Sequence, residues 1–125
     1  MHSGECVRVD IVRVFSDASA RPHHRGWGAV LVADGRKPHI MGGAIRGKRR
    51  TSTGLEAVGI ILARAAAQRY LRRHGLRVEL LVVHTDHQDI AWTFQEREGT
   101  AKLTYRWIAR EHPMMRWAHR RARML

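Results

Sequence analysis

The sequence predicts an α/β domain in which five strands form a mixed sheet with helices packed on it. Strand-like segments rich in β-branched residues come first, and a long segment with helical periodicity follows them. After that helix, strand-like and helix-like segments alternate, which favours strands parallel to the first because such crossovers are right-handed. The length of 125 residues is that of a single domain, which we expect to span residues 1 to 125.

The first half is predicted to form a three-stranded meander. The strands are expected over residues 7 to 16, 27 to 34 and 37 to 46, with loops over 17 to 26 and 47 to 52. Asp34 and Gly35 form a typical hairpin turn between the second and third strands. Pro38 and the pair Gly42 and Gly43 weaken the third strand, so we expect it at an edge of the sheet.

The second half is predicted to alternate between helices and strands. Helices are expected over residues 53 to 74, 87 to 97 and 114 to 124, and strands over residues 77 to 85 and 102 to 109. Leu55, Val58 and Leu62 recur at helical spacing, and Gly75 ends that helix. The strongly apolar segment 77 to 85 is typical of a buried central strand, and Pro113 opens the last helix.

The composition favours a polyanionic partner. The formal net charge is +12, from 23 Lys and Arg against 11 Asp and Glu, which suits nucleic acid first and an anionic membrane second. No stretch reaches the roughly 18 apolar residues of a membrane span, and charges interrupt the apolar run near the N-terminus. The single cysteine, Cys6, fits a reducing compartment, so we expect a cytoplasmic protein. We expect no membrane partner, and the sequence predicts no protein partner.

Three carboxylates stand out among these few acids. Asp17 follows the first predicted strand, Asp86 follows the fourth, and Glu56 lies in the first turn of the long helix. If the two strands are parallel neighbours, the three acids converge at one end of the sheet, where a cation such as Mg²⁺ would offset their repulsion. Each also has a structural alternative: Glu56 in a capping box with Thr53, Asp86 as a helix N-cap, and Asp17 as a turn residue.

Several segments match known motifs in order along residues 12 to 124. The first is VRVFSDASA, similar to a strand motif of the form apolar-x-apolar-aromatic-T-D-G-S, and the second is GWGAVLV, with its Gly-x-Gly. TSTGLEAVGIILA is similar to a helix that carries a glutamate, and VVHTDHQDI to a motif T-D-S-Q followed by an apolar pair. HPMMRWAHRRAR is similar to a last helix that begins with H-P-E-N. Together these segments resemble the type 1 ribonuclease H family.

The resemblance implies both a fold and a chemistry. The fold would be a sheet of strand order 3-2-1-4-5, and the activity would be endonucleolytic hydrolysis of the RNA strand of an RNA–DNA hybrid, leaving a 5′ phosphate. The four metal-binding positions of the family fall on Asp17, Glu56, Asp86 and His119. They imply two divalent ions, Mg²⁺ or Mn²⁺, that activate a water and stabilise the leaving oxygen.

The resemblance also implies residues outside the metal cluster. His112 stands where many relatives have a histidine that shuttles protons, so it joins the expected catalytic residues. Ser52 and Thr53 lie near a substrate-contacting position of the family, and Gln88 stands at another. Arg50, in the basic loop, completes the expected nucleic-acid contacts.

The chain departs from the family pattern in several places, among them Ala18 in place of the usual glycine after the first aspartate. His119 replaces the usual aspartate, which leaves the site one negative charge short and suits Mn²⁺ better than Mg²⁺. Met115 replaces an asparagine. The segment between Asp86 and Trp107 has room for one short helix, so we expect a compact form without the basic protrusion of many relatives. Two clusters are candidates for the missing grip: Lys48, Arg49 and Arg50, or Arg116, Arg120, Arg121 and Arg123.

Other functions fit the same residues. A DNA junction resolvase on the same fold would differ only in substrate. A non-catalytic nucleic-acid-binding module with a decayed site would explain His119 and Met115, although it would not need the three acids. A basic ribosome-associated protein on a related fold would not need them either.

Overall fold

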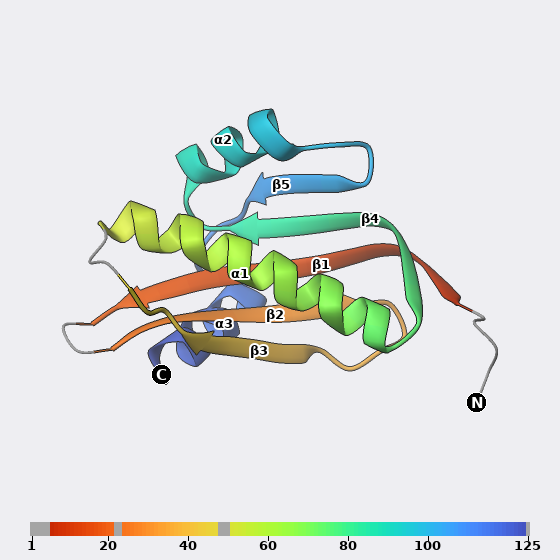
Figure 1. Ribbon diagram of the computed structural model, residues 1–125, viewed down its shortest axis with the longest axis horizontal. Helices are drawn as coiled ribbons and strands as arrows, with labels where there is room; N and C mark the ends of the chain where they lie inside the picture. The colour runs from red at the N-terminus through yellow and green to blue at the C-terminus, as the bar shows by residue number, and fades with distance from the viewer. Residues whose placement is uncertain (1–5, 22–23, 48–50, 125) are drawn as a thin grey trace.

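The computed structural model describes residues 6–21, 24–47 and 51–124, and it contains the predicted elements in the predicted order (Figure 1). The strands are β1 (Val7–Ala20), β2 (Arg25–Ala33), β3 (His39–Ala44), β4 (Leu76–Thr85) and β5 (Leu103–Trp107). The helices are α1 (Ser52–Arg73), α2 (Gln88–Glu98) and α3 (Pro113–Arg123).

The five strands form one mixed sheet of order β3-β2-β1-β4-β5, which confirms the predicted fold class and strand order. β1, β2 and β3 are antiparallel neighbours, whereas β4 pairs with β1 and β5 pairs with β4 in parallel. The weakened strand β3 lies at an edge, as expected, and the apolar strand β4 lies inside the sheet. Only α2 lies between β4 and β5, so the chain has the compact form without a basic protrusion.

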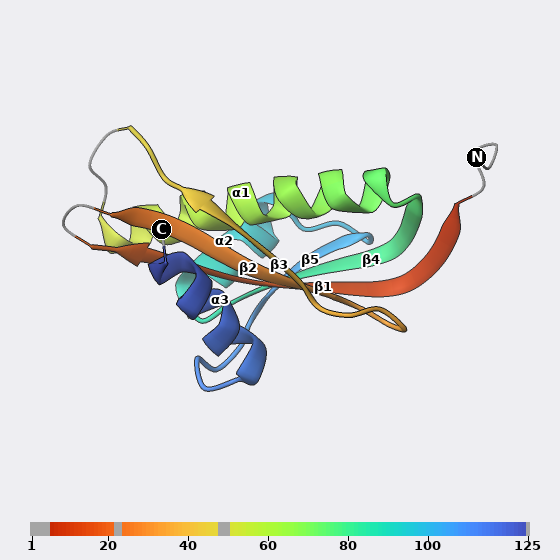
Figure 2. The same ribbon diagram turned by 90° about the horizontal axis from the view of Figure 1, so that it is seen from below.

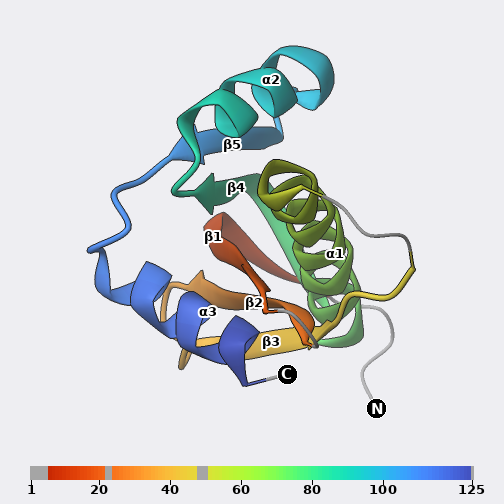
Figure 3. The same cartoon turned by 90° about the vertical axis from the view of Figure 1, so that its left-hand side faces the viewer.

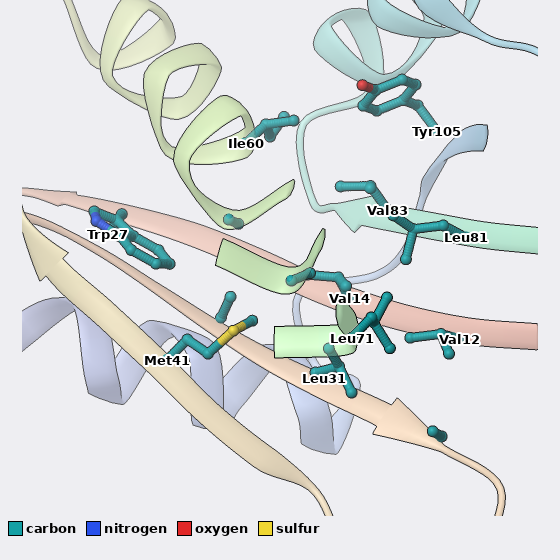
Figure 4. Packing of buried hydrophobic residues seen from close by; sticks show 14 of the residues in the cluster. Val12, Val14, Trp27, Leu31, Met41, Ile60, Leu71, Leu81, Val83 and Tyr105 are labelled. Atoms are coloured by element: carbon teal, nitrogen blue, oxygen red, sulfur yellow. The ribbon is translucent and has the colours of Figure 1, made fainter. Parts of the chain in front are cut away.

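The helices cover both faces of the sheet. Figure 2 shows α1 on one face and α3 on the other, and Figure 3 shows α2 beside β5 at the far edge. The main hydrophobic core lies between α1 and the sheet (Figure 4), where Val12, Val14, Ile60 and Val83 are fully buried. None of the helices in the described part of the chain combines the length and apolar character that a membrane crossing requires.

Helix α3 reaches its position because β2 carries a glycine beneath it. A Cβ atom added at Gly28 would lie 2.3 Å from the backbone oxygen of Ala118 and 2.6 Å from the backbone nitrogen of Ala122. The helix turns buried Met115, Ala118 and Ala122 toward the sheet, so two of its three contact residues are also small. The absence of a side chain at Gly28 therefore allows the backbones of α3 and β2 to approach closely.

The largest difference from the predicted boundaries is in the first hairpin. A loop was expected over residues 17 to 26, but β1 continues to Ala20 and β2 begins at Arg25. Antiparallel pairing runs from Val12↔Ala33 to Ala20↔Arg25, so Asp17 lies within β1 and not after it. The parallel pairing with β4 stops earlier, at Phe15↔His84. The polar composition of this segment suggested a loop, but the extended hairpin pairing overrides that local signal.

Candidate metal and nucleic-acid site

Two of the predicted acids come from neighbouring parallel strands. Asp17 lies two residues beyond the last β1–β4 pair, and Asp86 directly follows β4. Both side chains emerge where β1 and β4 separate, which is the position expected for a site on parallel strands. The side chain of Asp17 is almost fully buried, at 8% exposed, whereas that of Asp86 is 17% exposed.

The third acid, Glu56, reaches the same place from α1. The backbone N–H of Ala18 donates to Oδ1 of Asp17 at 2.9 Å and to Oε1 of Glu56 at 3.0 Å. This shared donor orients both carboxylates, since a backbone amide has a fixed direction. One carboxylate oxygen from each of Asp17, Glu56 and Asp86 lies within 4.8 Å of the others, as predicted.

Local capping does not explain these acids. The N-cap of α1 is Thr51, whose side chain accepts from the N–H of Gly54, so Glu56 lies beyond the first turn and forms no capping box with Thr53. The N-cap of α2 is His87, whose Nδ1 accepts from the N–H of Ile90, so Asp86 is not a cap either. The structural alternatives for Glu56 and Asp86 are therefore wrong, and so is the placement of Glu56 in the first turn.

The electrostatics of the cluster favour a bound cation. Burial, a hydrogen bond with Asp17 and the charge of Asp17 raise the pKa of Glu56 to about 9. Burial and the charge of Asp17 also raise the pKa of Asp86. Oε2 of Glu56 is buried and has no hydrogen-bond partner. A divalent cation would satisfy this oxygen and favour the ionised carboxylates, so the donor set fits a hard ion such as Mg²⁺ or Mn²⁺.

His119 joins the cluster from the opposite face of the sheet. Its Nδ1 lies 2.7 Å from Oδ2 of Asp17, while about half of its side chain (52%) is exposed. An ionised carboxylate only accepts hydrogen bonds, so in this contact Nδ1 carries the proton and Nε2 is the remaining nitrogen. The structure thus brings together all four residues that were expected to bind metal, with His119 hydrogen-bonded to one of the acids.

The acids open into a cleft with a volume of about 910 Å³. Its lining combines the four site residues with Ser52, Met115 and the arginines Arg21, Arg110, Arg116, Arg120 and Arg123. Nε of Arg110 lies 3.7 Å from Oδ2 of Asp86, and its side chain is 78% exposed. A cleft lined by both carboxylates and guanidinium groups suits a phosphate backbone together with a divalent ion.

Most of the other expected residues that the structure describes do not line the cleft. His112 is the N-cap of α3, where its Nδ1 accepts from the N–H of Met114 at 3.2 Å. Its ring stacks on Phe15, which stacks in turn on His84, with ring centroids 5.0 and 4.7 Å apart. Ser52 lines the cleft. Thr53 and Gln88 are exposed, and neither they nor His112 line it. Arg50, with Lys48 and Arg49, lies outside the described residues.

Two features of the site were missed in the sequence. Arg110 lies in the connection between β5 and α3, and no motif or periodicity marked it as a partner of Asp86. The N–H of Ala18 carries no signal in the sequence because every residue except proline has one. The row of arginines along α3 was visible, since Arg116, Arg120 and Arg123 recur at helical spacing.

Comparison with solved structures supports one fold. The N-terminal RNase H domain of a Mycobacterium tuberculosis protein, solved as a fusion with maltose-binding protein, superposes with a TM-score of 0.69 at 17% identity, covering 92% of each chain. LC11-RNase H1 in complex with an RNA/DNA hybrid gives a TM-score of 0.65 at 17% identity, covering 88% of this chain and 92% of that one. RNase H1 from the halophilic archaeon Halobacterium salinarum gives a TM-score of 0.54 at 20% identity, covering 91% of this chain and 75% of that one.

The chain therefore has the ribonuclease H fold, and the resemblance to type 1 ribonucleases H is confirmed at that level. No protein-family model matches the sequence, and no curated protein matches it. At identities of 17 to 20% the comparisons establish the fold, and the function must be argued from the site.

Proposed function

We propose that this protein is a divalent-metal-dependent endonuclease that hydrolyses the RNA strand of RNA–DNA hybrids and leaves a 5′ phosphate. One observation carries the proposal: three carboxylates converge within 4.8 Å in a cleft that arginines also line. Burial and mutual repulsion make such a cluster of ionised carboxylates costly unless a cation binds there. A bound divalent cation with a basic surface around it suits phosphodiester hydrolysis.

Asp17, Glu56 and Asp86 would hold the cation, and His119 would be the fourth ligand. Two bound divalent ions supply charge neutralisation at the phosphate and a nucleophilic water at neutral pH. The N–H of Ala18 keeps Asp17 and Glu56 oriented. Glu56 must release its proton when the site fills. With Nδ1 of His119 bound to Asp17, its Nε2 would be the atom available to hold a cation.

The hybrid is proposed as substrate for two reasons. One structural neighbour is RNase H1 bound to an RNA/DNA hybrid, and the same fold is present here. The basic cleft also suits a duplex with two phosphate backbones. We propose Ser52, Thr53, Gln88 and Arg50 as contacts to the hybrid and His112 as the proton shuttle. Use of His112 requires that its ring leave the stack with Phe15. The proposed location is the cytoplasm, from the single cysteine.

The decisive test is cleavage of an end-labelled RNA–DNA hybrid in Mg²⁺ and, separately, in Mn²⁺. Asp17→Asn is the control, because it removes a ligand charge without changing the side-chain volume. Cleavage by the natural chain that Asp17→Asn abolishes supports the proposal, and faster cleavage in Mn²⁺ supports ligation by His119. A 5′ phosphate on the product would show that the bond between phosphorus and the 3′ oxygen is the one cleaved. Duplex RNA, duplex DNA and a four-way junction serve as competing substrates.

A second candidate is a non-catalytic nucleic-acid-binding module. It is favoured by His119, which stands at a metal position of the family but is hydrogen-bonded to Asp17. Tight hybrid binding without cleavage in either metal would establish this function. Cleavage of the junction alone would instead assign the chain to DNA junction resolution.

A further inference from the structure

We infer that the arginine row of α3, defined as Arg116, Arg120 and Arg123, grips the phosphates of the strand that enters the acid cluster. The inference rests on the proposed function. It assigns to this helix the duplex contacts for which the compact fold has no protrusion between β4 and β5.

The row forms one edge of α3 beside the acids. Arg116, Arg120 and Arg123 follow the spacing i, i+4 and i+7, which places them on one side of a helix. His119 lies on that same side, and its Nδ1 is 2.7 Å from Oδ2 of Asp17. All three arginines are exposed and line the cleft that holds the three carboxylates. The row therefore flanks the place where the scissile phosphate would bind.

Among the residues that the structure describes, no hydrogen bond or ion pair explains the position of the row. Within the described ranges, Arg8, Arg64 and Arg110 form ion pairs with carboxylates, whereas no member of the row does. Neighbouring like charges on a helix repel one another. The helix dipole favours Arg120 and Arg123 in the last turn, but it disfavours Arg116, which lies four residues after the N-cap His112. A polyanion in the cleft would relieve these repulsions.

The length of the row suits one strand of a duplex. Seven residues of helix rise about 10 Å from Arg116 to Arg123. Successive phosphates of one strand advance by about 3.4 Å along a duplex axis, so about three phosphates fit the row. The guanidinium group matches phosphate oxygens in a bidentate manner. We therefore assign the row to the phosphates next to the scissile one, which in the proposed reaction belong to the RNA strand.

Binding measured apart from cleavage tests this assignment. In the Asp17→Asn background, the triple variant Arg116→Gln, Arg120→Gln and Arg123→Gln is compared with a control triple, Arg69→Gln, Arg72→Gln and Arg73→Gln. The control arginines are also exposed, and they lie near the far end of α1, so both triples lose the same charge (Figure 1). Affinity for a fluorescent hybrid is measured by anisotropy over a series of salt concentrations, and circular dichroism checks folding.

The row variant is expected to lose about 100-fold in affinity at 0.1 M salt, and the slope of log K against log salt should fall by about 2 to 3. The control triple should lose much less affinity, and its slope of log K against log salt should change much less. Equal losses in the two triples would overturn the inference, because net charge alone would then explain binding. Failure of the Asp17→Asn protein itself to bind hybrid at low salt would instead count against the proposed function.

The strand assignment is tested with a hybrid whose DNA strand carries neutral methylphosphonate linkages. Contacts to the RNA strand predict that the difference between row variant and control persists on this hybrid. Its disappearance would place the row on the DNA strand and overturn the assignment.

Discussion

The two faces of the sheet differ in how their helices pack and in the groups that they carry. The α1 face carries the main hydrophobic core, in which Val12, Val14, Ile60 and Val83 are fully buried. On the other face, α3 packs closely through Met115, Ala118 and Ala122 against a strand that carries Gly28. That face also holds the partly exposed His119 against Asp17. The comparison indicates that α1 mainly stabilises the sheet, whereas α3 mainly positions charged groups beside the acids.

The largest expected effects come from cavities made on each face in turn. Ile60→Ala and Met115→Ala each remove a fully buried side chain, so each should lower the free energy of unfolding by about 2–5 kcal/mol. Only Met115→Ala should also weaken Mn²⁺ binding, because it loosens the helix that carries His119. Urea unfolding and metal titration of the folded protein measure the two effects. Equal losses of metal affinity would contradict the division between the faces.

A pair of glycine substitutions tests the same division with smaller changes. Gly28→Ala would push a Cβ against the backbone of α3, so we expect a loss of about 1–3 kcal/mol and a displaced His119. At Gly59 on α1 the nearest contact is the Cβ of Ala18 at 3.3 Å, so Gly59→Ala should change stability by less than about 1 kcal/mol. Thermal unfolding of both variants with and without Mn²⁺ measures the loss of stability and the stabilisation by the metal. A Gly28→Ala protein as stable as Gly59→Ala would show that α3 moves freely.

Glu56 is the contribution of α1 to the acid cluster, and its ionisation separates the two roles of that helix. Its folded pKa of about 9 lies above its usual 4.5, so without metal this group makes stability fall as pH rises from about 4.5 to about 9. The fall is at most about 1.4 kcal/mol per pH unit. Glu56→Gln should flatten the dependence and abolish metal binding. Urea unfolding in a chelator at several pH values measures how the free energy of unfolding depends on pH. If Glu56 were already ionised in the folded protein, Glu56→Gln would leave that dependence unchanged.

The smallest expected effect concerns Arg110, which pairs with Asp86 across 3.7 Å while largely exposed. Exposed ion pairs contribute about 0–1 kcal/mol, so Arg110→Gln should hardly change stability. Removing this competitor for Asp86 should raise metal affinity by about fivefold or less. Calorimetric titration with Mn²⁺ measures the change. Weaker metal binding in Arg110→Gln would show that the arginine orients Asp86 and does not compete with the ion.

Much of the fold was predictable because its signals are local. The β-branched strands, the helical spacing of Leu55, Val58 and Leu62, and the ending at Gly75 are encoded within short segments. The weak third strand was placed correctly at an edge for the same reason. The first hairpin was not predicted to its full length, because the pairing of Asp17 with Gly28 depends on a neighbouring strand.

The sequence by itself determined the order of elements, the convergence of Asp17, Glu56 and Asp86, and the basic character that suits a polyanion. Only the tertiary structure decided that α3 crosses β2 at Gly28, which brings His119 to Asp17 over 102 residues of chain. It also decided that the N–H of Ala18 serves two carboxylates and that Arg110 reaches Asp86. Periodicity and motifs report which face of an element is buried, whereas contacts between distant side chains depend on how closely two backbones can pack.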